Sequence, residues 1–304
     1  MKLGFVSSVM ANYTFEQVVD FAAAQGFDCV EMACWPVGKA ERRYAGVTHI
    51  DVDGVTDERA AYIQDYCAAK GVDISSLAYY PNTMDKDPAK RAYYIEHLKK
   101  VILASEKLGI NMVTTFIGRV TDMNMDENLR IYAQVWPDIV AFAEEHRVRI
   151  AIENCPMWFT NDEWPGGQNI AVSPVIWRKM FEIIPSPNLG INYDPSHFIL
   201  QHMDYLKPLY EFRDRIYHIH YKDIKIFKDK LDDYGTMANP SLYTAPKIPG
   251  HGDINWASYV SALRDIGFEG YTCIEIEDRS FESSDAAIEQ SLILSKRYLN
   301  QFIY

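Results

Sequence analysis

Residues 263–276 read LRDIGFEGYTCIEI, and the fold can be predicted by working outward from this stretch. A helical pattern ends near Ile266, Gly267 supplies a stop, and a strand rich in β-branched and aromatic residues follows at 271–276. Residues 23–32, AAQGFDCVEM, show the same order of helix end, glycine and strand. The shared order indicates a recurring structural unit and does not establish a duplication of sequence.

The same unit recurs along the whole chain. We predict strands at 3–6, 29–32, 73–79, 111–117, 149–153, 189–194, 216–222 and 271–276. We predict helices at about 14–24, 57–69, 88–108, 126–145, 173–184, 204–212, 255–266 and 285–300. Eight strands that alternate with eight helices fit a closed (β/α)8 TIM barrel of class α/β, as one domain over residues 1–304. A doubly wound open sheet is disfavoured, because no GxGxxG motif follows the first strand.

The composition excludes several classes of partner. The chain has 304 residues and a formal net charge of −12, which argues against nucleic acid, whose phosphates attract basic surfaces. No apolar run reaches the ~20 residues of a membrane span, and the N-terminus does not resemble a signal peptide. The five cysteines form no CxxC pair, so we expect reduced thiols. We therefore expect a soluble, cytoplasmic protein without a nucleic-acid or membrane partner.

Two predicted strand-to-helix connections are unusually long, at about 154–171 and 223–253. We expect both to lack helices and strands of their own. Such loops in a barrel lie on the face where active sites are built, which favours a lid or a substrate wall. The alternative is a surface excursion that serves contacts between subunits.

Four successive strands end in polar residues with metal-binding side chains. Glu153, Asp194, His220 and Glu275 stand at or near the carboxyl ends of strands five to eight, which meet at one rim of a barrel. One acidic residue at a strand end is usually a helix cap or an ion-pair partner, but buried carboxylates in a group repel each other without a cation. Three carboxylates and one imidazole suit a hard divalent ion. We predict one such ion, with Mn²⁺ favoured and Mg²⁺, Co²⁺ or Zn²⁺ as alternatives.

The sequence also resembles a known family. The segments GFDCVEM, RIAIEN, GINYDPSH, HIHYKD, PGHGDINW and GFEGYTCIEIED resemble the xylose isomerase-like barrel superfamily, in particular its D-tagatose 3-epimerase branch, over nearly the whole chain. The resemblance implies that Glu153, Asp194, His220 and Glu275 bind the metal. It also implies that Glu153 and Glu275 move a proton on the two faces of a sugar carbon and that His197 contacts the substrate.

This site predicts a reaction intermediate better than a product. A metal-bound carbonyl and a carboxylate base give an enediolate, and return of the proton from the other face gives isomerisation or epimerisation of a ketose or related polyol. Loss of a neighbouring hydroxyl from the same intermediate would make the enzyme a lyase. The HIHYKD segment offers lysines where ketohexose epimerases have a substrate-binding arginine. Together with the long 223–253 loop, it resembles inosose dehydratases, uncharacterised sugar-phosphate isomerase-like proteins or the metal subunit of C-glycoside deglycosidases.

Five further residues are candidates for substrate binding, and each has a structural alternative. Lys222 could bind a substrate oxygen or balance negative charge, and Asn154 could lie at the rim. His251, in PGHGD, could enter the site or belong to a turn. Trp35 and Tyr79 could form a wall for a sugar face, although aromatic residues at strand ends are often core.

Two other functions compete with the enzyme of sugar metabolism. A non-catalytic sugar-binding barrel is disfavoured, because all four candidate ligands are present. An endonuclease IV-like nuclease needs more histidines, and strands three and four end in Ala78-Tyr79-Tyr80 and Thr115-Phe116-Ile117. We expect a small sugar or polyol as the partner, and analogy with barrel relatives suggests a homo-oligomer.

Overall fold

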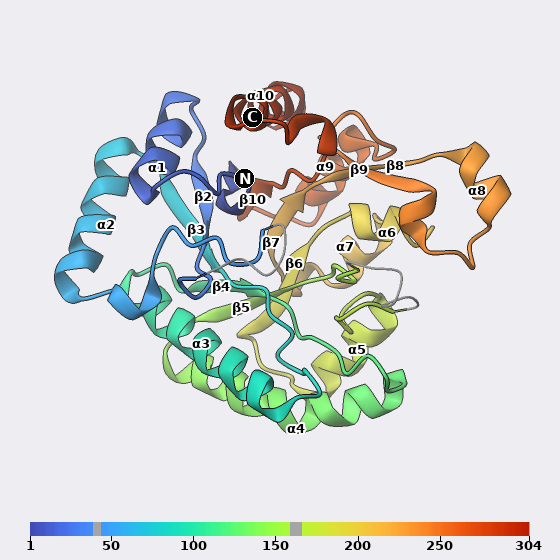
Figure 1. Ribbon diagram of the computed structural model, residues 1–304, viewed down its shortest axis with the longest axis horizontal. Coiled ribbons are helices and arrows are strands. Elements are labelled where there is room, and N and C mark those ends of the chain that lie inside the picture. Colours follow the sequence, from blue (N-terminus) through green and yellow to red (C-terminus); the bar gives the residue numbers. More distant parts are fainter. Residues whose placement is uncertain (39–43, 159–165, 304) are drawn as a thin grey trace.

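Eight parallel strands close into a barrel in the order β1-β10-β7-β6-β5-β4-β3-β2, as the computed structural model shows for residues 1–38, 44–158 and 166–303 (Figure 1). These strands are β1 Lys2–Val6, β2 Cys29–Ala33, β3 Asp73–Ala78, β4 Met112–Thr115, β5 Arg149–Glu153, β6 Leu189–Tyr193, β7 Ile216–Tyr221 and β10 Tyr271–Ile274. The predicted TIM barrel is confirmed. The last strand ends at Ile274, two residues earlier than expected, so Glu275 stands just beyond it.

Helices surround the barrel, as Figure 1 shows. They are α1 Phe15–Ala24, α2 Asp57–Lys70, α3 Pro88–Lys107, α4 Met125–Glu145, α5 Pro174–Ile183, α6 Ser196–Ile199, α7 Lys207–Glu211, α8 Lys228–Tyr234, α9 Trp256–Asp265 and α10 Asp285–Leu299. Short 3-10 turns occur at Ser7–Val9, Val52–Gly54, Arg213–Arg215, Pro240–Leu242 and Arg279–Phe281. Most bounds lie within two residues of those predicted, but the helix expected at 204–212 is reduced to α7.

Local sequence signals fix the helix ends. The Thr14 side chain accepts a hydrogen bond from the Gln17 N–H, and the Gln17 side-chain oxygen accepts one from the Thr14 N–H. Asp87 caps α3, whose first residue is Pro88. Gly71 ends α2 with φ of +67°, a conformation that favours glycine because it has no Cβ.

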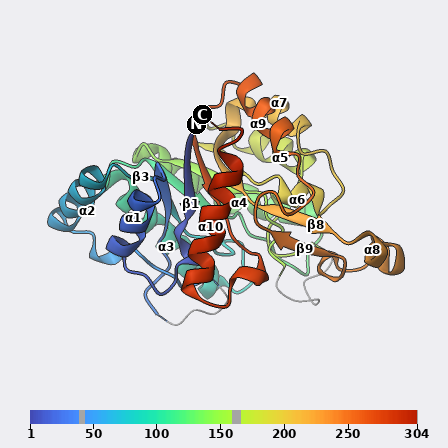
Figure 2. The ribbon, with the colours of Figure 1, turned by 90° about the horizontal axis from the view of Figure 1, so that it is seen from above.

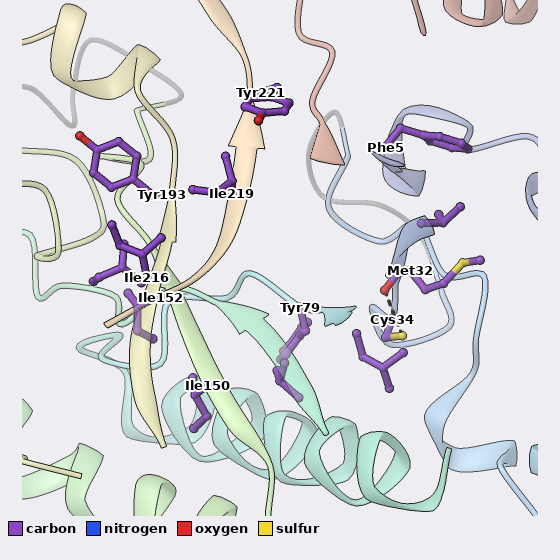
Figure 3. Close-up of a cluster of buried hydrophobic side chains, with 14 of the residues drawn as sticks. Phe5, Met32, Cys34, Tyr79, Ile150, Ile152, Tyr193, Ile216, Ile219 and Tyr221 are labelled. Atoms are coloured by element: carbon purple, nitrogen blue, oxygen red, sulfur yellow. Dashed lines mark hydrogen bonds between the residues drawn. The ribbon is translucent and has the colours of Figure 1, made fainter. Parts of the chain in front are cut away.

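The hydrophobic core lies between the barrel and its helices. Ile152 on β5, Ile219 on β7 and Ile274 on β10 are fully buried in one cluster with residues from the surrounding helices. Figure 3 shows part of this cluster, drawn from several strands. Because side chains alternate along a strand, these outward-facing residues leave their neighbours to face the barrel axis. The alternation therefore directs the polar residues toward the candidate site.

The 223–253 connection has secondary structure, contrary to the expectation that it would have none. Strands β8, Asp223–Ile226, and β9, Thr244–Lys247, pair in antiparallel register. Helix α8 comes between them in the sequence and lies at the outer edge of the molecule (Figures 1 and 2). The turn that follows is held by Asp223, whose buried carboxylate accepts hydrogen bonds from the N–H groups of Gly250 and Gly252 and from the Trp256 indole. The 223–253 connection is thereby anchored to the barrel at both ends. In the other long connection, residues 159–165 lie outside the described residues.

Within the described residues, no helix combines the length and apolar character that a membrane span requires. The five cysteines are all unpaired, as the sequence predicted.

Candidate active site

A cavity of about 880 Å³ opens at the carboxyl ends of the strands. Its floor includes Glu153, Lys222 and Glu275. Aromatic side chains form part of its wall, namely Trp35, Tyr44, Tyr80, Phe116 and Trp158. The 223–253 connection supplies another part of the wall through Asn239, Ser241 and residues 244–247. This position agrees with the sequence interpretation in which the connection forms a lid or a substrate wall.

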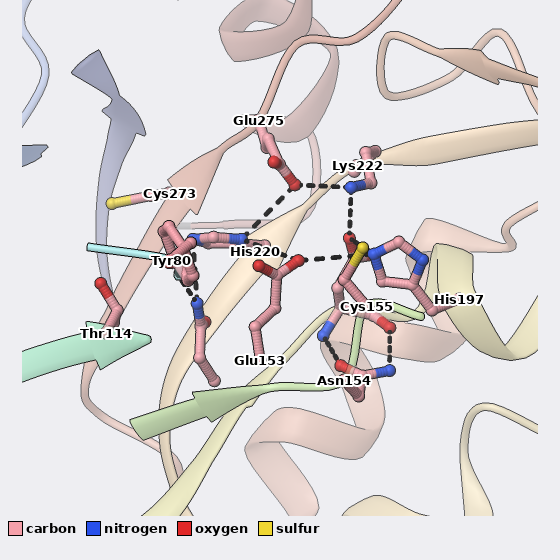
Figure 4. Close-up of polar contacts among 12 residues, drawn as sticks. Tyr80, Thr114, Glu153, Asn154, Cys155, His197, His220, Lys222, Cys273 and Glu275 are labelled. Carbon is pink, nitrogen blue, oxygen red and sulfur yellow. Dashed lines mark hydrogen bonds and ion pairs between the residues drawn. The ribbon is translucent and has the colours of Figure 1, made fainter. Parts of the chain in front are cut away.

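Three of the four predicted metal ligands, Glu153, His220 and Glu275, lie close together. Glu153 is the last residue of β5, His220 lies inside β7, and Glu275 follows β10. The Nδ1 atom of His220 lies 3.6 Å from Glu153 Oε1 and 3.4 Å from Glu275 Oε2 (Figure 4). His220 is fully buried and Glu153 nearly so. One metal ion can reach all three side chains, because their ligand atoms lie within 4.8 Å of one another.

Asp194, the fourth predicted ligand, follows β6 and is fully buried. Its Oδ2 atom lies 3.1 Å from His197 Nε2, and its Oδ1 accepts a hydrogen bond from the Ser196 N–H at 2.8 Å. Asn154 fixes the backbone of this residue, since its amide donates to the Asp194 carbonyl and accepts from the Asp194 N–H. Asn154 is itself 0% exposed, and these two hydrogen bonds indicate that it positions Asp194.

Lys222 places a buried cation beside the predicted ligands. Its Nζ atom lies 2.7 Å from Glu275 Oε2, 3.1 Å from Asp194 Oδ2 and 3.2 Å from Glu277 Oε2. Of the alternatives that the sequence left open, the balancing of negative charge agrees with these ion pairs.

Glu31 is a buried site residue that the sequence interpretation missed. It lies on β2, is 0% exposed, and its Oε2 is 3.0 Å from His220 Nε2. The signal that could have found it is the recurring unit noted above. In that unit Glu31 stands two residues after Cys29, just as Glu275 stands two residues after Cys273. Both cysteines pair with Gly4 of β1, so the two glutamates stand at the same level on either side of that strand.

The electrostatics of the site keep its acids ionised. Complete burial would raise the pKa of Glu153, but the neighbouring His197 and His220 rings bring it below its usual value. Burial likewise opposes ionisation of Asp194, whose pKa is nevertheless lowered by Lys222 and His197.

The cations of the site are held charged in the same way. Burial would lower the pKa of Lys222 and of His220, but the surrounding carboxylates raise both well above their usual values. Each buried charge therefore depends on several opposite charges, and removal of one member leaves the rest uncompensated.

The residues present fit a divalent metal ion. Three buried atoms of the predicted ligands make no hydrogen bond among the described residues: Glu153 Oε1, Asp194 Oδ2 and His220 Nδ1. Buried polar atoms without such bonds are rare in proteins and call for a partner. Glu153, His220 and Glu275 offer carboxylate oxygens and one imidazole nitrogen, a donor set that suits a hard divalent ion.

The other predicted substrate-binding residues have different positions. His197 is nearly buried, with its Nε2 3.4 Å from Glu153 Oε1, and Trp35 lines the cavity. Tyr79 is fully buried against Trp35 and His97, so its neighbour Tyr80 lines the cavity in its place. His251 is exposed in the turn anchored by Asp223 and is not among the described residues that line the cavity.

Comparison with known proteins identifies the family. Residues 19–298 match the family model described as Xylose isomerase-like TIM barrel. The chain belongs to this family. An uncharacterised protein, YfiH of Bacillus subtilis, is 23% identical over 99% of this chain and 100% of its own length. An inosose dehydratase of Clostridium perfringens is 26% identical over 130 residues, which cover 40% of this chain and 41% of the dehydratase.

Solved structures share the fold over the whole chain. The crystal structure of a D-tagatose 3-epimerase-like protein has a TM-score of 0.71 at 18% identity and covers 100% of this chain and 97% of its own. The IOLI protein with a binding zinc atom has a TM-score of 0.70 at 17% identity and covers 100% of this chain and 99% of its own. At these identities the similarity establishes the barrel and leaves the reaction to be argued from the site.

Proposed function

We propose that this chain is a divalent-metal-dependent enzyme that isomerises or epimerises a ketose or related polyol carbonyl compound through an enediolate. The observation that carries the proposal is the approach of Glu153 and Glu275 to the same unsatisfied His220 Nδ1 atom at the floor of the cavity. The names of several structural relatives, which include a D-tagatose 3-epimerase-like protein, support the substrate class.

In this proposal Glu153, Asp194, His220 and Glu275 hold the ion. When bound, the ion would polarise the carbonyl and a neighbouring hydroxyl of the substrate as a Lewis acid. Mn²⁺ is the proposed ion because of the oxygen-rich ligand set, and the zinc in the IOLI structure supports a divalent ion more generally.

Glu153 and Glu275 are the proposed acid–base pair. They come from β5 and from the end of β10, so they approach the floor of the cavity from separate strands. One carboxylate removes the proton next to the carbonyl, and the other carboxyl group returns a proton to the opposite face. His197 and the aromatic wall bind the substrate, and Trp35 offers an apolar surface for a sugar ring.

A lyase of the same fold is the second candidate, and Lys222 is the observation that favours it. Its ammonium group lies 2.7 Å from Glu275 Oε2 and lines the cavity, so it can give a proton to a departing hydroxyl. The base would take the proton next to the carbonyl, the carbon–oxygen bond would break, and water would leave. The partial similarity to inosose dehydratases supports this alternative.

The experiment compares product formation by the wild type, Glu153→Gln and Glu275→Gln on ketoses, inososes and 3-keto glycosides with Mn²⁺. We expect each variant to lose most of its turnover while its circular dichroism spectrum and melting temperature stay close to the wild type. A near-normal rate in either variant would refute its acid–base role, and full activity of thoroughly metal-free protein would refute the metal centre. An unsaturated product would select the lyase.

A further inference from the structure

Glu31 is a buried carboxylate that the proposed chemistry does not use. Its Oε1 accepts a hydrogen bond from the Tyr80 hydroxyl at 2.7 Å, and its Oε2 accepts one from the Ser76 hydroxyl at 3.3 Å. The same Oε2 lies 3.0 Å from His220 Nε2. An ionised carboxylate only accepts hydrogen bonds, and two hydroxyl groups donate to this one.

The ring of His220 lies between this carboxylate and the two that face the cavity. Its Nδ1 atom is directed toward Glu153 and Glu275 (Figure 4), and its Nε2 atom lies 3.0 Å from Glu31 Oε2. A neutral imidazole that binds a metal ion through one nitrogen carries its proton on the other. The partner of Nε2 therefore determines whether Nδ1 is free to bind a metal ion.

Two groups compete for His220 Nε2. The Asn192 amide nitrogen and Glu31 Oε2 each lie 3.0 Å from it. The amide favours an Nε2 atom without a proton, whereas the carboxylate favours a protonated one. A hydrogen bond to an ionised acceptor is roughly twice as strong as one between neutral groups, so the carboxylate prevails.

Glu31 could also be read as a ligand of a second metal ion, since its ligand atoms lie close to those of His218 and His220. Hydrogen bonds already occupy this cluster, however. His218 lies 3.0 Å from the Asn192 amide oxygen through Nδ1 and 3.0 Å from the Ser75 hydroxyl through Nε2. The satisfied atoms indicate a hydrogen-bonded network, in contrast to the unsatisfied atoms at the cavity floor.

We propose that Glu31 is a positioning residue of the metal centre. It accepts the Nε2 proton of His220, fixes the orientation of the ring, and so leaves Nδ1 to bind the ion. The inference rests on the proposed function, because it explains how one ligand of that centre is prepared. Tyr80 and Ser76 hold the carboxylate in place, and Glu31 itself does not touch the metal or the substrate.

The test is the dissociation constant of Mn²⁺ for the wild type, Glu31→Gln and Glu31→Asp, measured by titration calorimetry without substrate. Loss of a carboxylate behind a ligating histidine weakens metal binding about 10–100-fold, which is the effect we expect for Glu31→Gln. Glu31→Asp keeps the charge and should recover part of the loss. Glu106→Gln is the matched control, because Glu106 also pairs with a histidine, His146 at 2.8 Å, but lies on the outer helix α3.

The tautomer of His220 gives a second measurement that needs no variant at Glu31. In the ¹⁵N-labelled, Zn²⁺-loaded wild type, with the His220 signals assigned by comparison with His220→Gln, we expect a protonated Nε2 and a metal-bound Nδ1. An unchanged Mn²⁺ affinity in folded Glu31→Gln, or a metal-bound Nδ1 without a proton on Nε2, would overturn the role of Glu31 while leaving the metal centre intact. A proton on Nδ1 would instead overturn His220 as a ligand through that atom. A wild type that binds no divalent ion would overturn the metal centre itself.

Discussion

Replacement of Lys222 by methionine tests whether the buried charges of the site depend on one another. Lys222 is 3% exposed, and its ammonium group lies within 3.2 Å of carboxylate oxygens of Asp194, Glu275 and Glu277. Methionine retains much of the side-chain volume and removes the charge. Removal of one member of a buried ion pair costs about 3–5 kcal/mol, because the partner charge stays buried without compensation. We expect a loss of this size in the free energy of unfolding of the metal-free protein.

A bound divalent ion should reduce this loss. The ion would share Asp194 and Glu275 with Lys222, so the two cations repel each other and each can compensate the carboxylates when the other is absent. Linkage then requires that Lys222→Met bind the ion more tightly than the wild type, by a factor of ten for each 1.4 kcal/mol by which the ion reduces the loss.

The assay is urea unfolding of the wild type and Lys222→Met, once with EDTA and once with saturating Mn²⁺, together with Mn²⁺ titration of both. Lys247→Met is the matched control. Lys247 pairs with Asp278 at the cavity mouth, so its effect on stability should not depend on the metal. A loss below about 1 kcal/mol in EDTA, or weaker Mn²⁺ binding by Lys222→Met, would refute the reasoning, since the expected cost of an unpaired buried charge is several times larger.

Three further predictions concern the surroundings of the site. Burial would raise the pKa of Asp278, but hydrogen bonds with Ser280 and Lys247 lower it below its usual value of about 3.9. The contribution of the ionised carboxylate to the free energy of unfolding is therefore complete above that pH, and it is lost as the pH falls through the folded pKa. Asp278→Asn should cost about 1–2 kcal/mol near neutral pH in urea unfolding and progressively less as the pH falls through the folded pKa, and a difference that grows toward acid would contradict this sign. Asn154→Ala removes two hydrogen bonds from the buried backbone of Asp194, so we expect a loss of about 1–3 kcal/mol and weaker Mn²⁺ binding in calorimetry; wild-type affinity would show that Asp194 needs no such support. Trp35→Ala should raise KM several-fold in steady-state assays without changing Mn²⁺ affinity, whereas a fall in kcat alone would argue against a substrate wall.

The barrel could be predicted because its signals are local. Capping residues such as Thr14, stop glycines such as Gly71, and strand alternation act within a few residues of sequence. The same alternation showed which residues of the later strands face the barrel axis. It therefore sufficed to bring Glu153, His220 and Glu275 together without knowledge of the packing.

What could not be predicted depends on contacts between distant segments. From the sequence alone, Glu31 is one residue of an ordinary buried strand. Its contact with His220 appears only when β2 and β7 are arranged around the same barrel axis. The pairing of β8 with β9 joins segments about twenty residues apart, and Pro246 made the second of them a poor strand candidate. Around His251 the neighbouring glycines were the only local sign of a turn. In the structure, the carboxylate of Asp223, a residue distant in sequence, holds that turn.

The central claim is that this cavity removes a proton from the carbon next to a carbonyl with the help of a divalent ion. The most direct test is the incorporation of solvent deuterium into ketoses, inososes and 3-keto glycosides, followed by NMR and mass spectrometry with Mn²⁺ present. We predict incorporation at that carbon by the wild type, which chelation abolishes and which Glu153→Gln and Glu275→Gln each greatly reduce. Absence of exchange across the whole panel by protein shown to contain the metal would contradict the claim and favour a sugar-binding barrel.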